Sequence, residues 1–391
     1  MALFGLGKSP APDSVPAAQQ APFFAVPTGG RGAFAPVEHL LSLVVEHNCS
    51  DLHLSVGTPP CVRMHGRLRK METRALLPED LEKLVTEIAT PGQLDRAKNE
   101  GSVDFAYSFR ERNRFRCSIY LQKGTLAIAM RLIPRKMLSL DEIGMPPSVR
   151  SLLTLPRGLV LVTGPTGSGK TTSLAAMLDI INRSASAHII SIEDPIEYIH
   201  EHQGGIVHQR EVGADVPSFA DGLRRALRQD PDVILVGEMR DLETMETAIT
   251  AAETGHLVFS TLHTTGAGRT VDRIVDAFPA HQQEQVRVQL ASNLRAVISQ
   301  LLVPRIDRPG RIAVFEVMML THSIGALIRD NKTFRIATEI QTGHKHGMVS
   351  LEASLVDLYL AGVIAREEVF AKAQDAEMAA QLLAGRESTR R

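Results

Sequence analysis

The stretch that decides the fold reads Gly164-Pro165-Thr166-Gly167-Ser168-Gly169-Lys170-Thr171-Thr172. An apolar, β-branched run at residues 159–162 precedes it, and a segment with helical spacing at residues 174–181 follows it. A strand, a glycine-rich loop and a helix in this order predict a phosphate-binding loop, because glycines let successive backbone N–H groups turn toward phosphate oxygens. A glycine turn with a purely structural role is the alternative.

We expect residues 164–172 to bind the phosphates of a nucleotide. Lys170 would contact the β and γ phosphates, and the hydroxyl of Thr171 would bind Mg²⁺. ATP and Mg²⁺ are therefore the predicted ligands.

The chain has 391 residues, which is enough for at least two hydrophobic cores. Its net charge of -1 gives no indication of a nucleic-acid partner. No run approaches the roughly 18 uncharged apolar residues of a membrane-spanning helix, and the opening Met1-Ala-Leu-Phe-Gly lacks the pattern of a secretory signal. We therefore expect a cytoplasmic protein.

The cysteines are Cys49, Cys61 and Cys117, scattered without a Cys-x-x-Cys pair. This spacing argues against a zinc site and against a disulfide framework. We expect all of them to be small, buried hydrophobic residues.

Composition and periodicity divide the chain into segments. Residues 1–36 are rich in Ala and Pro and are expected to form a flexible tail. The remainder predicts an α+β domain at residues 37–135, a linker at 136–154 and an α/β core at 155–280. A mainly helical part at 281–375 and a second flexible tail at 376–391 are expected to follow.

In the first domain we expect two helices and an antiparallel sheet, with the helices at 37–47 and 78–97 and strands at 51–56, 61–64, 103–109, 114–122 and 125–132. In the second, strands alternate with helices, which is typical of a parallel sheet covered on both faces. The expected strands are 159–162, 188–192, 233–236 and 257–262. After residue 280 the pattern predicts helices at 282–302 and 351–360.

Acidic residues follow two of the predicted strands. Glu193, Asp194 and Glu197 form a cluster that is by itself typical of a solvated turn. Beside a phosphate-binding loop in the same sheet the cluster favours hydrolysis, which needs a carboxylate to polarise water. We expect Glu197 to be this base, with Glu193 as the alternative. Glu238 stands where such strands usually end in Asp, and we expect it to help hold Mg²⁺.

Two histidines flank the fourth strand, His256 before it and His263 at its end. Seven residues of extended chain span roughly 23 Å, so the pair cannot share one ligand. His263 lies at the ligand end of the sheet, where we expect it to sense the γ phosphate, a structural role being the alternative. For His256, a structural role and a role across a subunit boundary stay open.

At this point several segments together resemble the Walker A, Asp box, Walker B and His box of secretion ATPases. They are residues 164–171, 192–197, 232–241 and 254–264. The resemblance covers about residues 37–370 and is greatest to the PilT-type retraction ATPases of type IV pili. A single module precedes the motor, and the tetracysteine zinc insertion common in assembly and type II secretion ATPases is missing.

The resemblance implies an α/β protein with a PAS-like α+β N-terminal domain, joined flexibly to a RecA-like P-loop NTPase domain that ends in a helical region. It implies a homohexameric ATPase that powers pilus retraction and twitching motility. Such a motor docks on a platform protein and is then peripheral to the inner membrane. An accessory retraction motor, and a pilus-assembly or type II secretion ATPase, are the alternatives.

The resemblance also assigns roles to three arginines. Arg116 and Arg131 correspond to N-terminal-domain arginines that reach the phosphates, and Arg273 corresponds to a motor-domain arginine at the site. A guanidinium supplies planar, permanently charged donors where negative charge develops on the transferred phosphoryl group.

One segment departs from the family pattern. Residues 323–330 read Ser-Ile-Gly-Ala-Leu-Ile-Arg-Asp, where retraction ATPases have Ala-Ile-Arg-Asn-Leu-Ile-Arg-Glu in a helix needed for output. Gly325 and Ala326 thus replace an Arg-Asn pair, which removes a charge and adds a helix-weakening glycine. The departure leaves the ATPase assignment intact and brings an accessory motor into consideration.

Two other classes of protein would share the glycine-rich loop. A DNA translocase needs a basic surface with aromatic side chains for stacking, and this chain has 0 Trp and 4 Tyr. A protein that binds nucleotide only as a structural ligand would lack the acids, yet Glu193, Glu197 and Glu238 are all present. ATP hydrolysis is therefore the predicted activity.

Overall fold

The computed structural model describes residues 34–64, 66–110, 113–133 and 137–389. The chain divides into two compact units, Met1–Ile133 and Pro134–Arg391. The flexible tail predicted for residues 1–36 lies outside the described residues except for 34–36, where Ala35 is buried.

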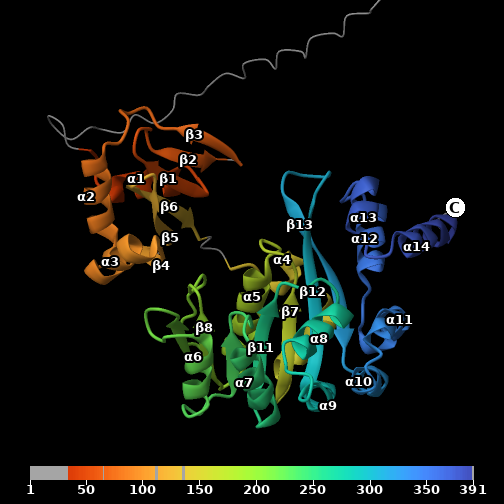
Figure 1. Ribbon diagram of the computed structural model, residues 1–391. Helices are drawn as coiled ribbons and strands as arrows, with labels where there is room; N and C mark the ends of the chain where they lie inside the picture. The colour runs from red at the N-terminus through yellow and green to blue at the C-terminus, as the bar shows by residue number, and fades with distance from the viewer. Residues whose placement is uncertain (1–33, 65, 111–112, 134–136, 390–391) are drawn as a thin grey trace, which may run out of the picture. The chain divides into compact units, whose positions relative to one another are not determined.

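The first unit is a six-stranded antiparallel sheet packed against helices (Figure 1). Its strands are ordered β3-β2-β1-β6-β5-β4. In chain order the elements are α1 (Val37–Glu46), β1 (Asp51–Ser55), β2 (Cys61–Met64), β3 (Arg67–Lys70), α2 (Pro78–Ile88), α3 (Pro91–Glu100), β4 (Ser102–Phe109), β5 (Asn113–Gln122) and β6 (Thr125–Leu132).

Side chains alternate across this sheet, as the two-residue period of a strand requires. Along β5, Phe115, Cys117 and Ile119 point into the core, whereas Arg116 is exposed on the other face. The cysteines Cys49, Cys61 and Cys117 are free and buried, which confirms their prediction as small core residues.

The second unit is built on a seven-stranded sheet with the order β13-β12-β7-β11-β10-β8-β9. Neighbouring strands are parallel except β12 and β13, which form an antiparallel pair at one edge. The strands are β7 (Gly158–Thr163), β8 (His188–Glu193), β9 (Ile206–Glu211), β10 (Val233–Val236), β11 (Leu257–Leu262), β12 (Leu294–Pro304) and β13 (Arg311–Met319).

Helices cover this sheet, and the C-terminal ones lie beside its β13 edge (Figure 1). The helices are α4 (Leu140–Ile143), α5 (Lys170–Ser184), α6 (Phe219–Ala226), α7 (Leu242–Glu253), α8 (Ala267–Asp276), α9 (Gln283–Asn293), α10 (His322–Arg329), α11 (Ile336–Thr342), α12 (Leu351–Leu360), α13 (Arg366–Lys372) and α14 (Ala376–Thr389). Short 3-10 turns add η1 (Pro147–Thr154), η2 (Thr333–Arg335) and η3 (Gly343–His346).

Two predicted helices were wrong in extent. The helix expected at 78–97 is broken into α2 and α3, because Pro91 lacks an N–H and Thr90 caps the new helix by accepting from the Gln93 amide. The helix expected at 282–302 ends at Asn293 and continues directly as β12, whose buried apolar run has no helical period.

Two segments expected to be irregular are ordered. The predicted linker at 136–154 contains α4 and η1, and Leu140, Val149 and Leu152 pack into the core of the second unit. The predicted tail at 376–391 forms α14 over residues 376–389, where Ala379 and Leu383 are buried in a cluster with α12. In both segments a few well-spaced apolar side chains provide enough burial to order short helices.

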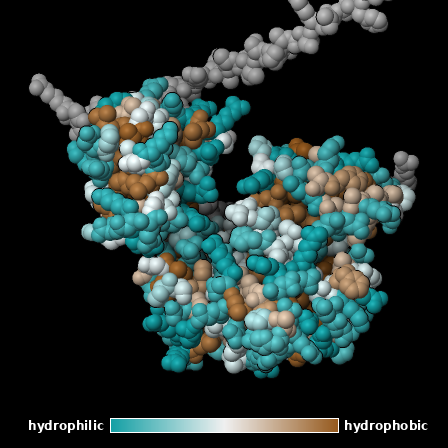
Figure 2. Space-filling model, viewed as in Figure 1, coloured by the Kyte–Doolittle hydropathy of each residue, from teal (hydrophilic) through white to brown (hydrophobic). Residues whose placement is uncertain are grey.

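The strands β3, β9 and β13 were not predicted. β3 and β9 are mostly polar, whereas β13 is largely apolar but lies after residue 280, in the part of the chain that was wrongly expected to be mainly helical. Hydrophilic residues dominate the visible surface, with apolar ones in small patches (Figure 2). Within the part of the chain that the structure describes, no helix is both long and apolar enough to span a bilayer.

Candidate nucleotide-binding site

The glycine-rich loop connects the end of β7 at Thr163 to the start of α5 at Lys170. Gly164, Gly167 and Gly169 have φ angles of 142°, 76° and 92°, in the region that side chains other than glycine avoid. A Cβ on Gly164 would also lie 2.2 Å from the backbone oxygen of Gln300. The loop therefore requires glycine for backbone conformation and, at Gly164, for close approach of a neighbouring strand.

Lys170 is buried, with 9% of its surface exposed. Its ammonium donates to the carbonyl oxygens of Gly164 at 2.8 Å and Pro165 at 3.2 Å. Burial lowers the pKa of Lys170, and the negative charge of Glu238 acts against that shift. An ammonium has three N–H donors, so one beyond these two bonds can be directed at a phosphate oxygen.

Glu238 and His263 lie beside the glycine-rich loop, near its residue Thr166. His263 Nε2 is 3.2 Å from Glu238 Oε2, and His263 Nδ1 makes a long contact of 3.5 Å with Thr166 Oγ1. An N–H at His263 Nε2 would donate to the Glu238 carboxylate, and Nδ1 of that tautomer would accept from the Thr166 hydroxyl. Arg240, which sequence reasoning missed, forms a 2.5 Å ion pair with Glu238 Oε1. The fold thus joins the ends of β10 and β11 to the glycine-rich loop.

Glu193 and Glu197 have different surroundings. Glu193 is buried, and its Oε1 accepts from Ser191 Oγ at 2.6 Å and from Gln209 Nε2 at 3.0 Å. Gln209 also donates to the backbone oxygen of Tyr198, so Glu193 helps to fix the loop that follows β8. Glu197 is half-buried within that loop. These contacts suit a structural role for Glu193, and the role of Glu197 as the base stays a prediction.

The same loop contacts the first turn of α5. The hydroxyl groups of Thr172 and Tyr198 are 3.1 Å apart. Thr171 is half-buried beside Thr172 at the start of the helix. Its hydroxyl and the Glu238 carboxylate are oxygen donors of the kind that Mg²⁺ prefers.

Gln300 is a residue of the site that sequence reasoning missed. It is 2% exposed, and its Oε1 accepts from Ser173 Oγ of α5 at 2.8 Å. Its backbone faces Gly164 and its amide nitrogen faces Gly169. Ser299 and Gln300 are polar residues in an otherwise apolar run, and that contrast was the available signal.

A cavity of about 520 Å³ opens beside the loop, within the size range of ligand sites. The start of α5, Gln300 and the carboxylates Asp141 and Glu142 of α4 line it. Arginines from the β12–β13 hairpin also line it, namely Arg305, Arg308 and Arg311. The cavity therefore has room and polar groups for the base and ribose of a nucleotide.

The three predicted arginines belong to other elements of the chain. Arg273 is exposed on α8. Arg116 and Arg131 belong to the first unit, where they are cross-strand neighbours on β5 and β6. Arg131 Nε is 2.8 Å from Asp51 Oδ1. Burial alone would raise the pKa of Asp51, but the Ser50 hydroxyl and the Arg131 guanidinium outweigh it and hold this pKa below its usual value.

A parallel sheet with a glycine-rich loop at the carboxyl end of a central strand, followed by a helix and flanked by acids, defines a P-loop ATPase with a RecA-like core. The family described as type II/IV secretion system protein matches residues 35–317. The chain belongs to this family, and within it to the PilT-type ATPases.

Individual relatives agree with this assignment. The type IV pilus retractation ATPase PilT of Pseudomonas aeruginosa is 45% identical over 338 residues, which are 86% of this chain and 98% of that protein. The type IV pilus ATPase PilU of the same species is 41% identical, with 87% and 89% covered. A crystal structure of the pilus retraction motor PilT with bound ADP matches with a TM-score of 0.82 and 43% identity, over 88% of this chain and 98% of that one.

These matches confirm the predicted family and the predicted fold, a sheet-containing N-terminal unit followed by a RecA-like ATPase unit with a helical C-terminal region. They also support nucleotide binding by the chain. The roles of the individual site residues stay predictions.

Proposed function

We propose that the protein is a motor that hydrolyses ATP to power retraction of type IV pili. The observation that supports this most is the match along nearly the whole length of a pilus retraction motor, which includes both units of the chain. One end of the motor sheet carries the glycine-rich loop with Lys170, Glu238 and His263, in an arrangement suited to phosphate chemistry.

In the proposed reaction, Lys170 stabilises the β and γ phosphates and the backbone of residues 164–169 surrounds them. Glu197 removes a proton from the attacking water, and Glu193 is the alternative base. His263 contacts the γ phosphate while Glu238 holds its ring in place. A bound Mg²⁺, held by Thr171 and Glu238, would neutralise negative charge on the phosphates.

We also propose that Arg116, Arg131 and Arg273 contribute to turnover. The side chain of Arg131 is 71% exposed in its ion pair with Asp51. Its partner Asp51 is buried, with 8% of its side chain exposed, and a buried carboxylate needs partners. Asp51 also accepts from Ser50 Oγ at 2.7 Å and lies 3.6 Å from Arg63 Nε, so it would keep these partners if Arg131 turned to a phosphate oxygen.

The assembly that we propose is a homohexamer docked on a platform protein of the inner membrane, with the ring on the cytoplasmic side. Cyclic homo-oligomers place identical interfaces around a ring, so each subunit can act in turn on a central partner. Sedimentation of the full chain with ATP should show a species of six subunits.

A second candidate function is that of an accessory retraction motor. Gly325 lies on α10, and a Cβ there would be 3.3 Å from the backbone oxygen of Ala291 on α9. The glycine thus allows these helices to pack closely at the segment that departs from the family pattern. This close packing of α10 on α9 is the observation that favours an output different from that of a main motor.

Deletion of the gene, with complementation by wild type, tests the function. Loss of twitching in the deletion strain is the result expected for a main motor. Twitching that persists but weakens under load identifies an accessory motor. Twitching and pilus number unchanged in every condition would rule out both, and in that case ATP turnover of the purified protein still tests the enzyme assignment.

A further inference from the structure

A row of buried polar residues crosses three strands of the motor sheet. Ser299 of β12 is paired in register with Thr163 of β7 on one side and with Glu316 of β13 on the other. The Thr163 and Ser299 hydroxyl groups are 2.7 Å apart. All of these side chains are buried, and Thr163 immediately precedes the glycine-rich loop.

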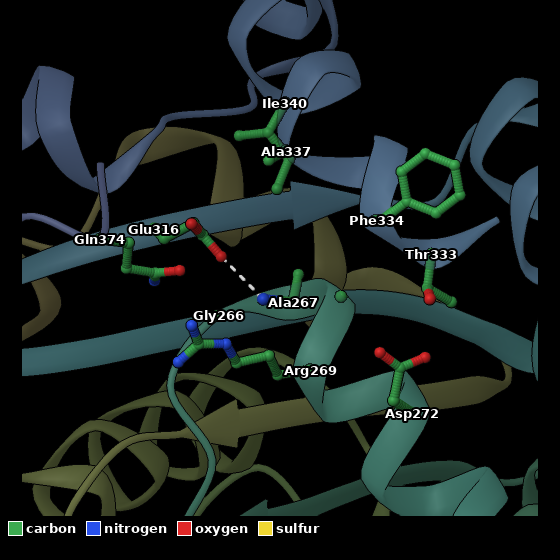
Figure 3. Close-up of a pocket in the computed structure, with 11 residues that line it drawn as sticks. Gly266, Ala267, Arg269, Asp272, Glu316, Thr333, Phe334, Ala337, Ile340 and Gln374 are labelled. Carbon is green, nitrogen blue, oxygen red and sulfur yellow. Dashed lines mark hydrogen bonds between the residues drawn. The ribbon is translucent and has the colours of Figure 1, made fainter. Parts of the chain in front are cut away.

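This row holds the turn that begins α8. Ser299 Oγ accepts from the Gly266 amide at 3.1 Å, and Glu316 Oε1 accepts from the Ala267 amide at 2.8 Å. Figure 3 shows the Glu316 carboxylate pointing at the start of the helix. A carboxylate at a helix N-terminus also interacts favourably with the helix dipole. The turn follows His263 by three residues, so the row links the strand that leads into the glycine-rich loop to the turn that follows His263.

We infer that Glu316 is a positioning residue for ATP hydrolysis: by accepting the Ala267 N–H, it fixes the turn between His263 and α8 relative to the glycine-rich loop. The inference rests on the proposed role of that loop and of His263 in turnover.

The cost of burying this carboxylate supports a functional role. Burial raises the pKa of Glu316 to about 7, the Ala267 amide acts against that shift, and the charge of Glu352 adds to it. Glu316 lines a cavity of about 290 Å³, and Arg269 and Asp272 of α8 line the same cavity (Figure 3). A side chain that only filled space here would be more stable as an uncharged residue.

Ionisation changes the strength of the contact. The carboxylate is a stronger acceptor for the Ala267 N–H than the protonated acid, because charge-assisted hydrogen bonds are stronger than neutral ones. The turn is therefore held more firmly above pH 7 than below it. We expect kcat of the wild type to rise through pH 7.

The test compares Glu316→Ala with Glu316→Gln in the full chain. Alanine removes the acceptor, so kcat should fall about tenfold while KM changes less than about twofold. Glutamine keeps an oxygen acceptor of the same shape, so it should restore kcat to within about threefold of wild type, and its profile should be flat through pH 7. If alanine fails to fold, the glutamine profile alone decides.

Glu352 provides a matched control. It is also buried, but its Oε1 accepts from the Gln374 and Asp375 amides near α14. Glu352→Gln should leave kcat at pH 8 unchanged and move the rise in kcat to lower pH, because a like charge near Glu316 is removed.

Three results would overturn the inference: wild-type kcat in Glu316→Ala, a rise through pH 7 that persists in Glu316→Gln, or equal losses of kcat in the Glu316 and Glu352 variants. A wild-type protein without ATP turnover would instead overturn the proposed function.

Discussion

Lys170 combines a buried charge with bonds to the loop that it is expected to serve. Its ammonium bonds to Gly164 and Pro165, so replacement by alanine would leave the buried carbonyl oxygen of Gly164 and the part-buried one of Pro165 without this donor. Glutamine is the more informative change, because its amide can still donate to the loop but has no charge for the phosphates.

We predict that Lys170→Gln lowers ATP turnover at least about 100-fold, because the charge that stabilises the transferred phosphoryl group is lost. The melting temperature should change little. Phosphate release and thermal unfolding check the two parts. Turnover near that of the wild type would be incompatible with the P-loop assignment.

Substitutions of Glu197 and Glu238 should have different effects, because the two acids are expected to have different roles. Glu197→Gln should reduce turnover about 100-fold or more while the protein still binds ATP, because an amide keeps the shape but cannot take a proton. Glu238→Gln should mainly raise the Mg²⁺ concentration needed for half-maximal turnover. Nucleotide titration and Mg²⁺ titration measure these effects. If Glu197→Gln hydrolyses ATP normally, the role of base passes to Glu193.

Glu316 also predicts a pH dependence of stability. Because its pKa is raised to about 7 in the folded protein, the folded state holds this proton more tightly than the unfolded chain does. Its contribution therefore favours folding at pH 5 and declines as pH rises through 7. Relative to wild type, Glu316→Gln should gain up to about 3 kcal/mol between pH 5 and pH 8. Urea unfolding of both proteins tests this, and an equal difference at the two pH values would refute it.

At the scale of elements, β12 explains why the glycine-rich loop has its shape. Its Gln300 contacts the loop from a distant part of the sequence, because β12 pairs with β7 in the sheet. Gly164 and Gly167 both have positive φ, but a Cβ on Gly164 meets Gln300, whereas one on Gly167 would have nothing within 4 Å. Substitutions at these two glycines therefore share backbone strain and differ in contact with β12.

We predict that Gly167→Ala destabilises the protein by about 1 kcal/mol through backbone strain alone. Gly164→Ala should cost at least about 2 kcal/mol and should abolish nucleotide binding, because β12 must also move away. Thermal unfolding and binding of a fluorescent ATP analogue measure both effects. Equal behaviour of the two variants would show that contact with β12 does not shape the loop.

The elements that the sequence predicted best are apolar runs bounded by polar residues. β10 and β11 have the predicted limits, since strands buried on both faces read as continuous apolar runs. β12 has the same character, but it follows α9 without an intervening Gly or Pro, and Leu294 changes from helical to extended backbone at ψ 137°. Sequence alone shows no boundary there.

The residues of the candidate site likewise fall into those that the sequence points to and those that only the structure reveals. Lys170, Glu238 and His263 lie at the glycine-rich loop, and the sequence pointed to them because their chemistry requires particular residue types next to predicted strands. Their roles and that of Glu197 stay predictions. Gln300 stands out in the sequence only as a polar residue in an apolar run. The contacts of Gln300 and Glu316 could not be predicted, because these residues reach the loop and α8 only through the order of strands in the sheet. The residues that hold the site in place therefore depend on tertiary structure.

At the scale of the whole molecule, the chain combines two compact units, and the charged residues expected to act on ATP are divided between them. The motor unit holds the glycine-rich loop with its acids and His263, and the first unit holds Arg116 and Arg131. A motor must convert ATP turnover into movement, so the function of the whole protein is tested best by force in the cell.

The measurement that tests the proposed function most directly is the retraction of single labelled pili in cells whose own gene carries Lys170→Gln. The variant protein should be present at the normal level, and pili should still extend. We predict that retraction then stops, or stalls under a load that wild-type cells overcome. Retraction frequency and stall force equal to those of wild-type cells would contradict the account.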